Sequence, residues 1–107
     1  MQVKLAKLEE VPDEGLIMRT HGDRQVLLTK VEGRVYAMND VCSHQGAPLH
    51  QGQLGGPEGD DPFLVTCPWH AAHFDVRTGE VMQECPWATA LDAYPVEVRD
   101  GDVYVEL

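Results

Sequence analysis

The sequence predicts an all-β protein built from antiparallel strands. Apolar and polar residues alternate with a period of two over several short segments, and no window of eleven or more residues carries a 3.6-residue period. Two pairs of such segments are joined by the turn dipeptides Glu32-Gly33 and Asp100-Gly101, which are typical of β-hairpins. A chain of 107 residues suits one domain of this kind.

The first third of the chain carries the signals for four strands. Residues 3–8 alternate apolar with lysine side chains, and residues 16–19 form a second apolar segment. After the turn His21-Gly22-Asp23, residues 25–31 are rich in leucine and β-branched side chains. A tight turn then leads into residues 34–38, so we expect the last two segments to pair as a hairpin.

The C-terminal end gives the strongest hairpin signal. Residues 94–98 and residues 103–107 each alternate apolar with polar side chains. Asp100-Gly101 lies between them, and an Asp-Gly dipeptide flanked by alternating segments strongly favours a two-residue turn. We therefore expect an antiparallel hairpin to close the chain.

The middle of the chain departs from this pattern. Residues 39–87 contain six of the ten glycines, five of the seven prolines, all three cysteines and four of the five histidines. Prolines and glycines interrupt a strand ladder, so this segment cannot be a simple meander of strands. The polar, turn-rich residues 55–62 are expected to form a surface excursion. Because reactive groups commonly lie on loops held by a rigid scaffold, we expect the chemistry in this middle segment.

The charge balance excludes several classes of partner. Eight Lys and Arg against eighteen Asp and Glu give a formal net charge of −10, which repels phosphate backbones and anionic lipid. We therefore expect no binding to nucleic acid or to a membrane, and attraction to a basic partner surface. No apolar run approaches the roughly 20 residues of a membrane span, and the start lacks the apolar stretch of a signal peptide. These features predict a cytoplasmic protein.

Three cysteines, Cys42, Cys67 and Cys85, make an odd number that does not suit a disulfide framework. Two of them lie in short groups with a histidine, Cys42-Ser43-His44 and Cys67-Pro68-Trp69-His70. Thiolate and imidazole ligands suit zinc, copper or iron, and do not suit calcium or magnesium. One tetrahedral zinc could take all four side chains as a structural site. In a Rieske centre, one iron of a 2Fe–2S cluster takes two cysteines and the other takes two histidines, which matches one Cys and one His from each group.

Two longer segments resemble the cluster-binding loops of Rieske-type 2Fe–2S ferredoxins. They are Cys42-Ser43-His44-Gln45-Gly46-Ala47-Pro48-Leu49 and Cys67-Pro68-Trp69-His70-Ala71-Ala72-His73-Phe74-Asp75, and Arg77-Thr78-Gly79-Glu80 and the closing residues 95–105 are similar to the family as well. The resemblance covers essentially the whole chain. It implies that Cys42, His44, Cys67 and His70 are the ligands of one 2Fe–2S cluster.

The same resemblance implies the fold and its division. Rieske-type ferredoxins have antiparallel sheets arranged as a sandwich or barrel, with a small cluster-binding subdomain inserted. We accordingly expect residues 1–107 to form a single Rieske domain, with the cluster-binding subdomain over about 40–87 and the base subdomain formed by residues 1–39 and 88–107. Pro86 falls where the family has a third, proline-bearing loop that shields the cluster.

Departures from the high-potential Rieske proteins of respiratory chains imply a low reduction potential. Those relatives carry an extra cysteine in each loop and join the two by a disulfide, whereas Ala47 and Trp69 stand at the corresponding positions here. They also place a serine hydroxyl near a cluster sulfur, and Ala72 takes that place in this chain. Because hydrogen bonds to the sulfurs help to set the potential, we expect a value near the bottom of the Rieske range, about −150 mV.

The resemblance predicts an electron carrier and not an enzyme. A ferredoxin of this type accepts one electron from a flavoprotein reductase and passes it to a terminal oxygenase or another redox enzyme, and we expect a monomer. Beyond the four ligands only His21, His50 and His73 remain, with no second domain to arrange them around an oxygen-activating iron. Two alternatives stay open: the small subunit of an assimilatory nitrite reductase, and a zinc-stapled β module that serves for interaction.

Some other residues of the middle segment could be mistaken for functional ones. His73 is expected to be a partly exposed residue at the start of a strand, and His50 is not expected to be a ligand. Cys85 is expected to be a small, partly buried thiol. Trp69 could dock a partner or pack over the cluster, and both interpretations stay open.

Overall fold

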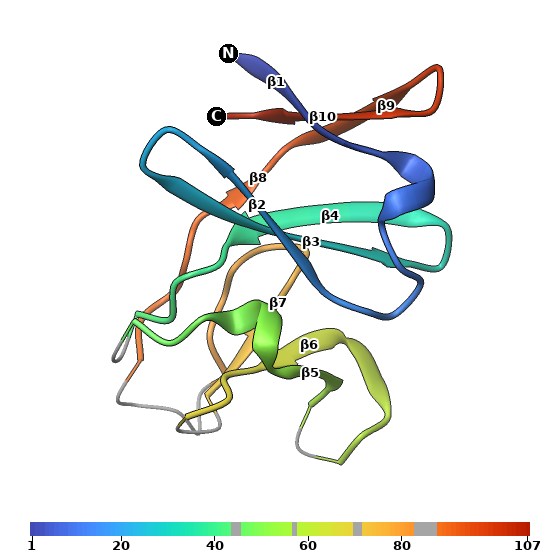
Figure 1. Ribbon diagram of the computed structural model, residues 1–107. Coiled ribbons are helices and arrows are strands. Elements are labelled where there is room, and N and C mark those ends of the chain that lie inside the picture. Colours follow the sequence, from blue (N-terminus) through green and yellow to red (C-terminus); the bar gives the residue numbers. More distant parts are fainter. Residues whose placement is uncertain (44–45, 57, 70–71, 83–87) are drawn as a thin grey trace.

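The computed structural model describes residues 1–43, 46–56, 58–69, 72–82 and 88–107. Within these residues the chain forms ten strands in three antiparallel sheets, which follow one another along the long direction of the molecule (Figure 1). Two single-turn helices, η1 (Leu8–Glu10) and η2 (Leu49–Gln51), accompany them. None of the helices in these ranges has the length and apolar character that crossing a bilayer requires. The predicted all-β, antiparallel fold class is confirmed.

The first sheet joins the two ends of the chain. It consists of β1 (Gln2–Lys7), β10 (Asp102–Glu106) and β9 (Val96–Arg99), in that order. Because β1 pairs antiparallel with β10, the two termini lie side by side (Figure 1). Asp100 and Gly101 form the turn between β9 and β10 with φ angles of 53° and 80°, the left-handed values that a two-residue hairpin requires. The predicted C-terminal hairpin is therefore present.

The second sheet is the centre of the molecule. Its strands are β2 (Ile17–His21), β3 (Arg24–Val31), β4 (Arg34–Asn39) and β8 (Ala93–Tyr94), in that order. The predicted hairpin between β3 and β4 is present, with Gly33 at a φ of 81° in its turn. The chain leaves this sheet at the end of β4 and returns to it only at β8, so the residues in between are free to form the third sheet.

The third sheet lies within the glycine- and proline-rich middle segment. It consists of β5 (Gln53–Gly55), β6 (Asp61–Thr66) and β7 (His73–Asp75), and it forms the lower end of the molecule in Figure 1. The predicted surface excursion corresponds to the link between β5 and β6, where residues 58–60 are exposed. The strands themselves were not predicted, because two of them are only three residues long.

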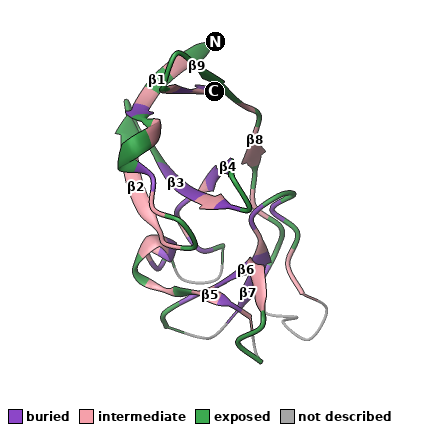
Figure 2. Cartoon of the chain, turned by 90° about the vertical axis from the view of Figure 1, so that its right-hand side faces the viewer, coloured by how far each residue is buried: buried purple, intermediate pink, exposed green. Residues whose placement is uncertain are grey.

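Two hydrophobic cores lie on opposite faces of the central sheet. Val26 and Leu28 of β3 pack against the terminal sheet, whereas Leu27 between them packs toward the third sheet. Successive residues of a strand point to opposite faces, and both faces of this sheet are covered, so all three side chains are fully buried. Figure 2 shows this burial along β3, between the two outer sheets. The second core, between the central sheet and the third sheet, contains Cys42 and Cys67.

Candidate metal centre

The first cysteine-containing loop runs from Cys42 to Ala47 and follows β4. The backbone N–H of Cys42 donates to the carbonyl oxygen of Ala47 at 2.9 Å, and the N–H of Gly46 donates to the carbonyl of Cys42 at 2.9 Å. Gly46 has a φ of 73°, which a residue with a side chain rarely adopts. One residue further out, Val41 and Pro48 form an isolated antiparallel bridge. These contacts close the loop at its base.

The second loop runs from Cys67 to Ala72 and connects β6 to β7. The N–H of Cys67 donates to the carbonyl oxygen of Ala72 at 2.8 Å, so the closing bond spans the same number of residues as in the first loop. Thr66 and His73 form the last cross-strand pair before the loop. The hairpin of β6 and β7 therefore presents Cys67 at its tip.

The two loops bring their cysteines into one buried cluster. Cys42 is 2% exposed and Cys67 is 1% exposed, and both belong to the core that contains Phe74. The other two predicted ligands, His44 and His70, lie outside the described residues. The structure thus brings together the two predicted cysteine ligands, and the assignment of the full set of four stays a prediction.

A pair of hydrogen bonds joins the first loop to the chain that precedes β8. The hydroxyl of Ser43 donates to the carbonyl oxygen of Thr89 at 2.7 Å and accepts the N–H of Thr89 at 2.9 Å. Sequence analysis did not single out either residue, because nothing in the sequence indicates that positions 46 residues apart are in contact. Cys85 and Pro86, which had their own predictions, lie outside the described residues.

Two histidines that are not predicted ligands stand at the bases of the loops. His50 donates its Nδ1–H to Oδ2 of Asp40 at 2.7 Å, and its backbone N–H donates to Oδ1 at 2.7 Å. Nδ1 of His73 is hydrogen-bonded to the hydroxyl of Thr66 at 2.9 Å. His73 begins β7 as expected but is only 8% exposed, so the expectation of partial exposure was wrong. Its cross-strand neighbour Thr66 supplies a polar partner, which allows the ring to be buried.

Asp40 is a buried carboxylate that sequence analysis missed. It is fully buried, and burial raises its pKa, although the hydrogen bonds and charge of His50 act in the opposite direction. A buried carboxylate is costly unless it is hydrogen-bonded, so the contacts with His50 compensate for this position. The sequence offered no signal for it, since aspartate is almost never fully buried without a partner and the partner lies ten residues away.

A hollow of about 740 Å³ opens beside the second loop. Cys67, Trp69 and His73 line it together with other side chains, and none of these described lining residues is Asp, Glu, Lys or Arg. Trp69 is 57% exposed at its rim. Of the two interpretations of Trp69, this exposure favours contact with a partner.

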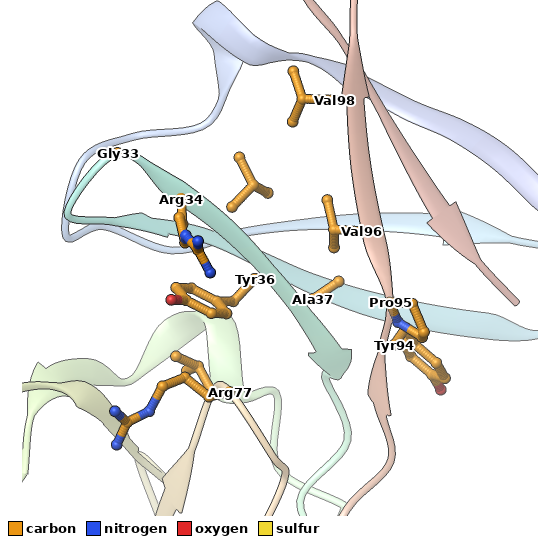
Figure 3. A pocket seen from close by; sticks show the side chains of 11 residues that line it. Gly33, Arg34, Tyr36, Ala37, Arg77, Tyr94, Pro95, Val96 and Val98 are labelled. Carbon is orange, nitrogen blue, oxygen red and sulfur yellow. The ribbon is translucent and has the colours of Figure 1, made fainter.

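A second hollow, of about 400 Å³, lies elsewhere on the molecule, between β4 and β9 (Figure 3). Arg34, Tyr36 and Arg77 line one side of it, and neither cysteine reaches it. Arg77 is held by Asp75, with Nη2 and Oδ2 2.8 Å apart. Burial opposes the ionisation of Asp75, but the hydrogen bonds and charge of Arg77 outweigh it and hold the pKa of Asp75 below its ordinary value. Because neither Cys42 nor Cys67 lines this hollow, it is separate from the metal centre.

Known proteins resemble this chain in both sequence and fold. The family model described as "Rieske [2Fe-2S] domain" matches residues 1–95. The chain belongs to this family. The 3-phenylpropionate/cinnamic acid dioxygenase ferredoxin subunit of Escherichia coli (strain K12) is 38% identical over 99 residues, which cover 92% of this chain and 86% of that protein.

Two solved structures resemble this Rieske protein over nearly its whole length. The ferredoxin of carbazole 1,9a-dioxygenase from Nocardioides aromaticivorans IC177 superposes with a TM-score of 0.85 at 27% identity, covering 98% of this chain and 96% of that one. A ferredoxin chain from the complex of reduced oxygenase and oxidized ferredoxin in carbazole 1,9a-dioxygenase gives a TM-score of 0.83 at 28% identity, covering 97% and 91%. The predicted Rieske family and its 2Fe–2S cofactor are confirmed, whereas the assignment of the four ligands stays a prediction.

The described part of the site fits such a cluster. One iron of a Rieske cluster takes two thiolates, and the structure supplies two cysteines, one from each of two loops with matching closure. Apolar side chains surround both cysteines, among them the fully buried Ala47 and Ala72 that accept their N–H groups. A shell of this kind controls solvent access to a metal site and thereby its redox potential.

Proposed function

We propose that this Rieske protein is a one-electron carrier that accepts an electron from a flavoprotein reductase and delivers it to a terminal oxygenase. The observation that carries the proposal is that Cys42 and Cys67 belong to the same buried core and that each begins a loop closed by a backbone hydrogen bond. The relatives support the same role, since they are ferredoxins of dioxygenase systems and one of them was solved in a complex with its oxygenase.

We assign the ligands as one Cys and one His from each loop: Cys42 and Cys67 for one iron, and His44 and His70 for the other. When bound, the cluster supplies a reversible one-electron couple. The chain itself buries the two thiolates almost completely and keeps water away from them. It also offers an alanine, Ala72, where high-potential relatives have a hydrogen-bonding serine, which supports a low potential.

The surface supports a transient role for the protein. The net charge of −10 favours partners with a basic surface. Among the described residues the large exposed apolar side chains are Met1, Trp69 and Val98, too few and scattered for a permanent apolar interface, so we propose a monomer. The nitrite reductase subunit and the zinc-stapled module are not favoured, because the relatives are ferredoxin subunits of an aromatic dioxygenase.

We also propose a division of the domain and a cellular location. The third sheet and both cysteine loops fall within residues 40–87, which supports this range as the cluster-binding subdomain, set on a base of residues 1–39 and 88–107. The cytoplasm is the proposed compartment. An odd number of cysteines, two of them proposed as metal ligands, suits a reducing environment.

Electron paramagnetic resonance of the anaerobically prepared, dithionite-reduced protein tests the ligand set, with iron and zinc assayed alongside. We expect iron and a rhombic signal whose average g value lies clearly below that of an all-cysteine 2Fe–2S centre. His44→Cys and His70→Cys should each change the spectrum and lower the potential. His21→Cys, at the exposed end of β2, is the matched control and should behave as the wild type. A colourless protein with stoichiometric zinc, or unchanged spectra of both ligand variants, would overturn the proposal.

A further inference from the structure

Each of the two cluster-binding loops is closed at its base by a backbone hydrogen bond and by a side-chain hydrogen bond. In each loop the cysteine N–H donates to the alanine carbonyl five positions on, at 2.9 Å from Cys42 and at 2.8 Å from Cys67. Outside each of these bonds a side-chain pair joins the two ends of the loop. Asp40 and His50 form the pair below the first loop, and Thr66 and His73 form the pair below the second. In both pairs the histidine uses Nδ1.

Below the first loop, the backbone of Asp40 is hydrogen-bonded on two sides. Its own N–H donates to the carbonyl of Gln25 in β3 at 2.9 Å, and its carbonyl accepts the N–H of Leu49 at 2.8 Å. The side chain then accepts two hydrogen bonds from His50, one from the backbone and one from the ring. Three bonds therefore join Asp40 to the far end of the loop, and a substitution of the His50 side chain removes the bond from the ring while it leaves the donors and acceptors of the other two in place.

Below the second loop, the pair spans two strands. Thr66 and His73 are cross-strand neighbours at the last position of the β6–β7 ladder. The ring of His73 is 8% exposed, and its backbone carbonyl accepts the N–H of Met82 at 2.9 Å. The ring is thus hydrogen-bonded to Thr66, while the backbone of His73 is hydrogen-bonded to the chain that leaves the hairpin.

We propose that His50 and His73 are positioning residues, each of which fixes the base of one ligand-bearing loop through a side-chain hydrogen bond. The inference rests on the proposed ligand set, because it concerns the loops that carry those ligands. The rings are not proposed as metal ligands. They limit how far the ends of each loop can separate, and so keep the two cysteines at a constant distance from one another.

The test uses the intact, cluster-loaded protein and two kinds of substitution. His50→Leu and His73→Leu keep an apolar side chain of moderate size and remove Nδ1. His50→Asn and His73→Asn keep a side-chain nitrogen that can replace Nδ1, and should restore the wild-type behaviour. Val103→Ala, at a fully buried position of β10 in the terminal sheet, is the control for a general loss of stability.

Three measurements separate positioning from general stability: metal release to a chelator, the spectrum of the reduced protein, and hydrogen exchange of the segments 40–50 and 66–73. Removing a hydrogen bond to a buried charge should speed metal release about tenfold in His50→Leu, and removing a neutral one about threefold in His73→Leu. Both variants should broaden or shift the g values and raise exchange in their own loop only. Val103→Ala should leave the spectrum unchanged.

The outcomes are distinct from those of the proposed function. If the wild-type protein lacks the rhombic signal, the proposed ligand set is refuted. Hydrogen exchange of segments 40–50 and 66–73 would still show whether the side-chain pairs fix the bases of the two loops. If the leucine variants release metal no faster than Val103→Ala and leave spectrum and exchange unchanged, the positioning role is refuted. Failure of the asparagine variants to restore wild-type behaviour would refute the assignment to the Nδ1 hydrogen bond.

Discussion

Gly79 lies in the turn after β7, where the chain contacts the segment that leads into β8. Its carbonyl accepts the N–H of Leu91 at 2.8 Å, and its own φ is 79°. A Cβ at this position would lie 1.8 Å from the carbonyl oxygen of Leu91, far inside the 3.0 Å below which real Cβ contacts essentially never occur. Substitution by alanine must therefore displace one of the two backbones by about 1 Å.

The expected cost of Gly79→Ala has two parts. An alanine held at left-handed φ loses roughly 1–2 kcal/mol, and forcing extra atoms into a packed site loses roughly 1–3 kcal/mol more. Gly33 and Gly101 separate the two parts, because their φ angles are 81° and 80° while a Cβ at either meets nothing within 4 Å. We expect Gly33→Ala and Gly101→Ala to lower the free energy of unfolding by about 1 kcal/mol each, and Gly79→Ala to lower it by about 3 kcal/mol.

Urea titration followed by circular dichroism, on all four proteins in the same cluster-loaded form, measures these differences. The steric part has a second readout, because Leu91 lies two residues after Thr89, which is hydrogen-bonded to Ser43 beside Cys42. Gly79→Ala should therefore also change the spectrum of the reduced protein, and the two hairpin variants should not. If Gly79→Ala costs no more than its controls, the close approach to Leu91 does not exist in solution.

Three further substitutions test other parts of the molecule. Asp75→Asn should lower the free energy of unfolding at pH 7 by about 1 kcal/mol. Because Arg77 depresses the pKa of Asp75, the wild type keeps this advantage above the ordinary carboxyl pKa of 3.8 and should lose it as the pH falls through the lower pKa of the folded state. Urea titrations of both proteins at pH 7 and at a pH below the folded-state pKa would show the loss. Gly52→Ala places a Cβ 1.9 Å from the carbonyl oxygen of Thr66 at an ordinary φ. We expect the free energy of unfolding to fall by about 2 kcal/mol and the spectrum of the reduced protein to change, and a loss of stability with an unchanged spectrum would contradict this. Ala72→Ser should raise the reduction potential by roughly 60 mV, the one-electron equivalent of a tenfold change, in a redox titration, and an unchanged potential would remove Ala72 from the causes of a low value.

The parts of the fold that were predicted are those that short segments decide on their own. Asp100-Gly101 determines its hairpin because both residues accept positive φ, and Gly33 does the same between β3 and β4. The third sheet could not be predicted in this way. Its strands β5 and β7 have three residues each, and they exist because β6 pairs with both of them. A period of two cannot be recognised in a strand of only three residues.

The same distinction holds at the site. Cys42 and Cys67 could be predicted as partners because their chemistry, in two similar loops, indicates a shared metal. The burial of His73 could not, because it depends on Thr66 on the neighbouring strand. Asp40 was missed for a related reason: its carboxylate is stabilised by His50, and that contact exists only once the first loop has closed.

The charge of the surface and the character of its hollow suit two different stages of an encounter. At distances up to a Debye length, about 8 Å at physiological ionic strength, the net charge of −10 attracts a basic partner and speeds association. At contact, the hollow beside Cys67 presents uncharged residues and the exposed ring of Trp69. Burying such residues against a partner does not require water to be removed from charged side chains, a step that costs free energy. A carrier must dissociate after every transfer, so attraction through a distributed charge combined with an uncharged contact surface gives both rapid arrival and rapid release.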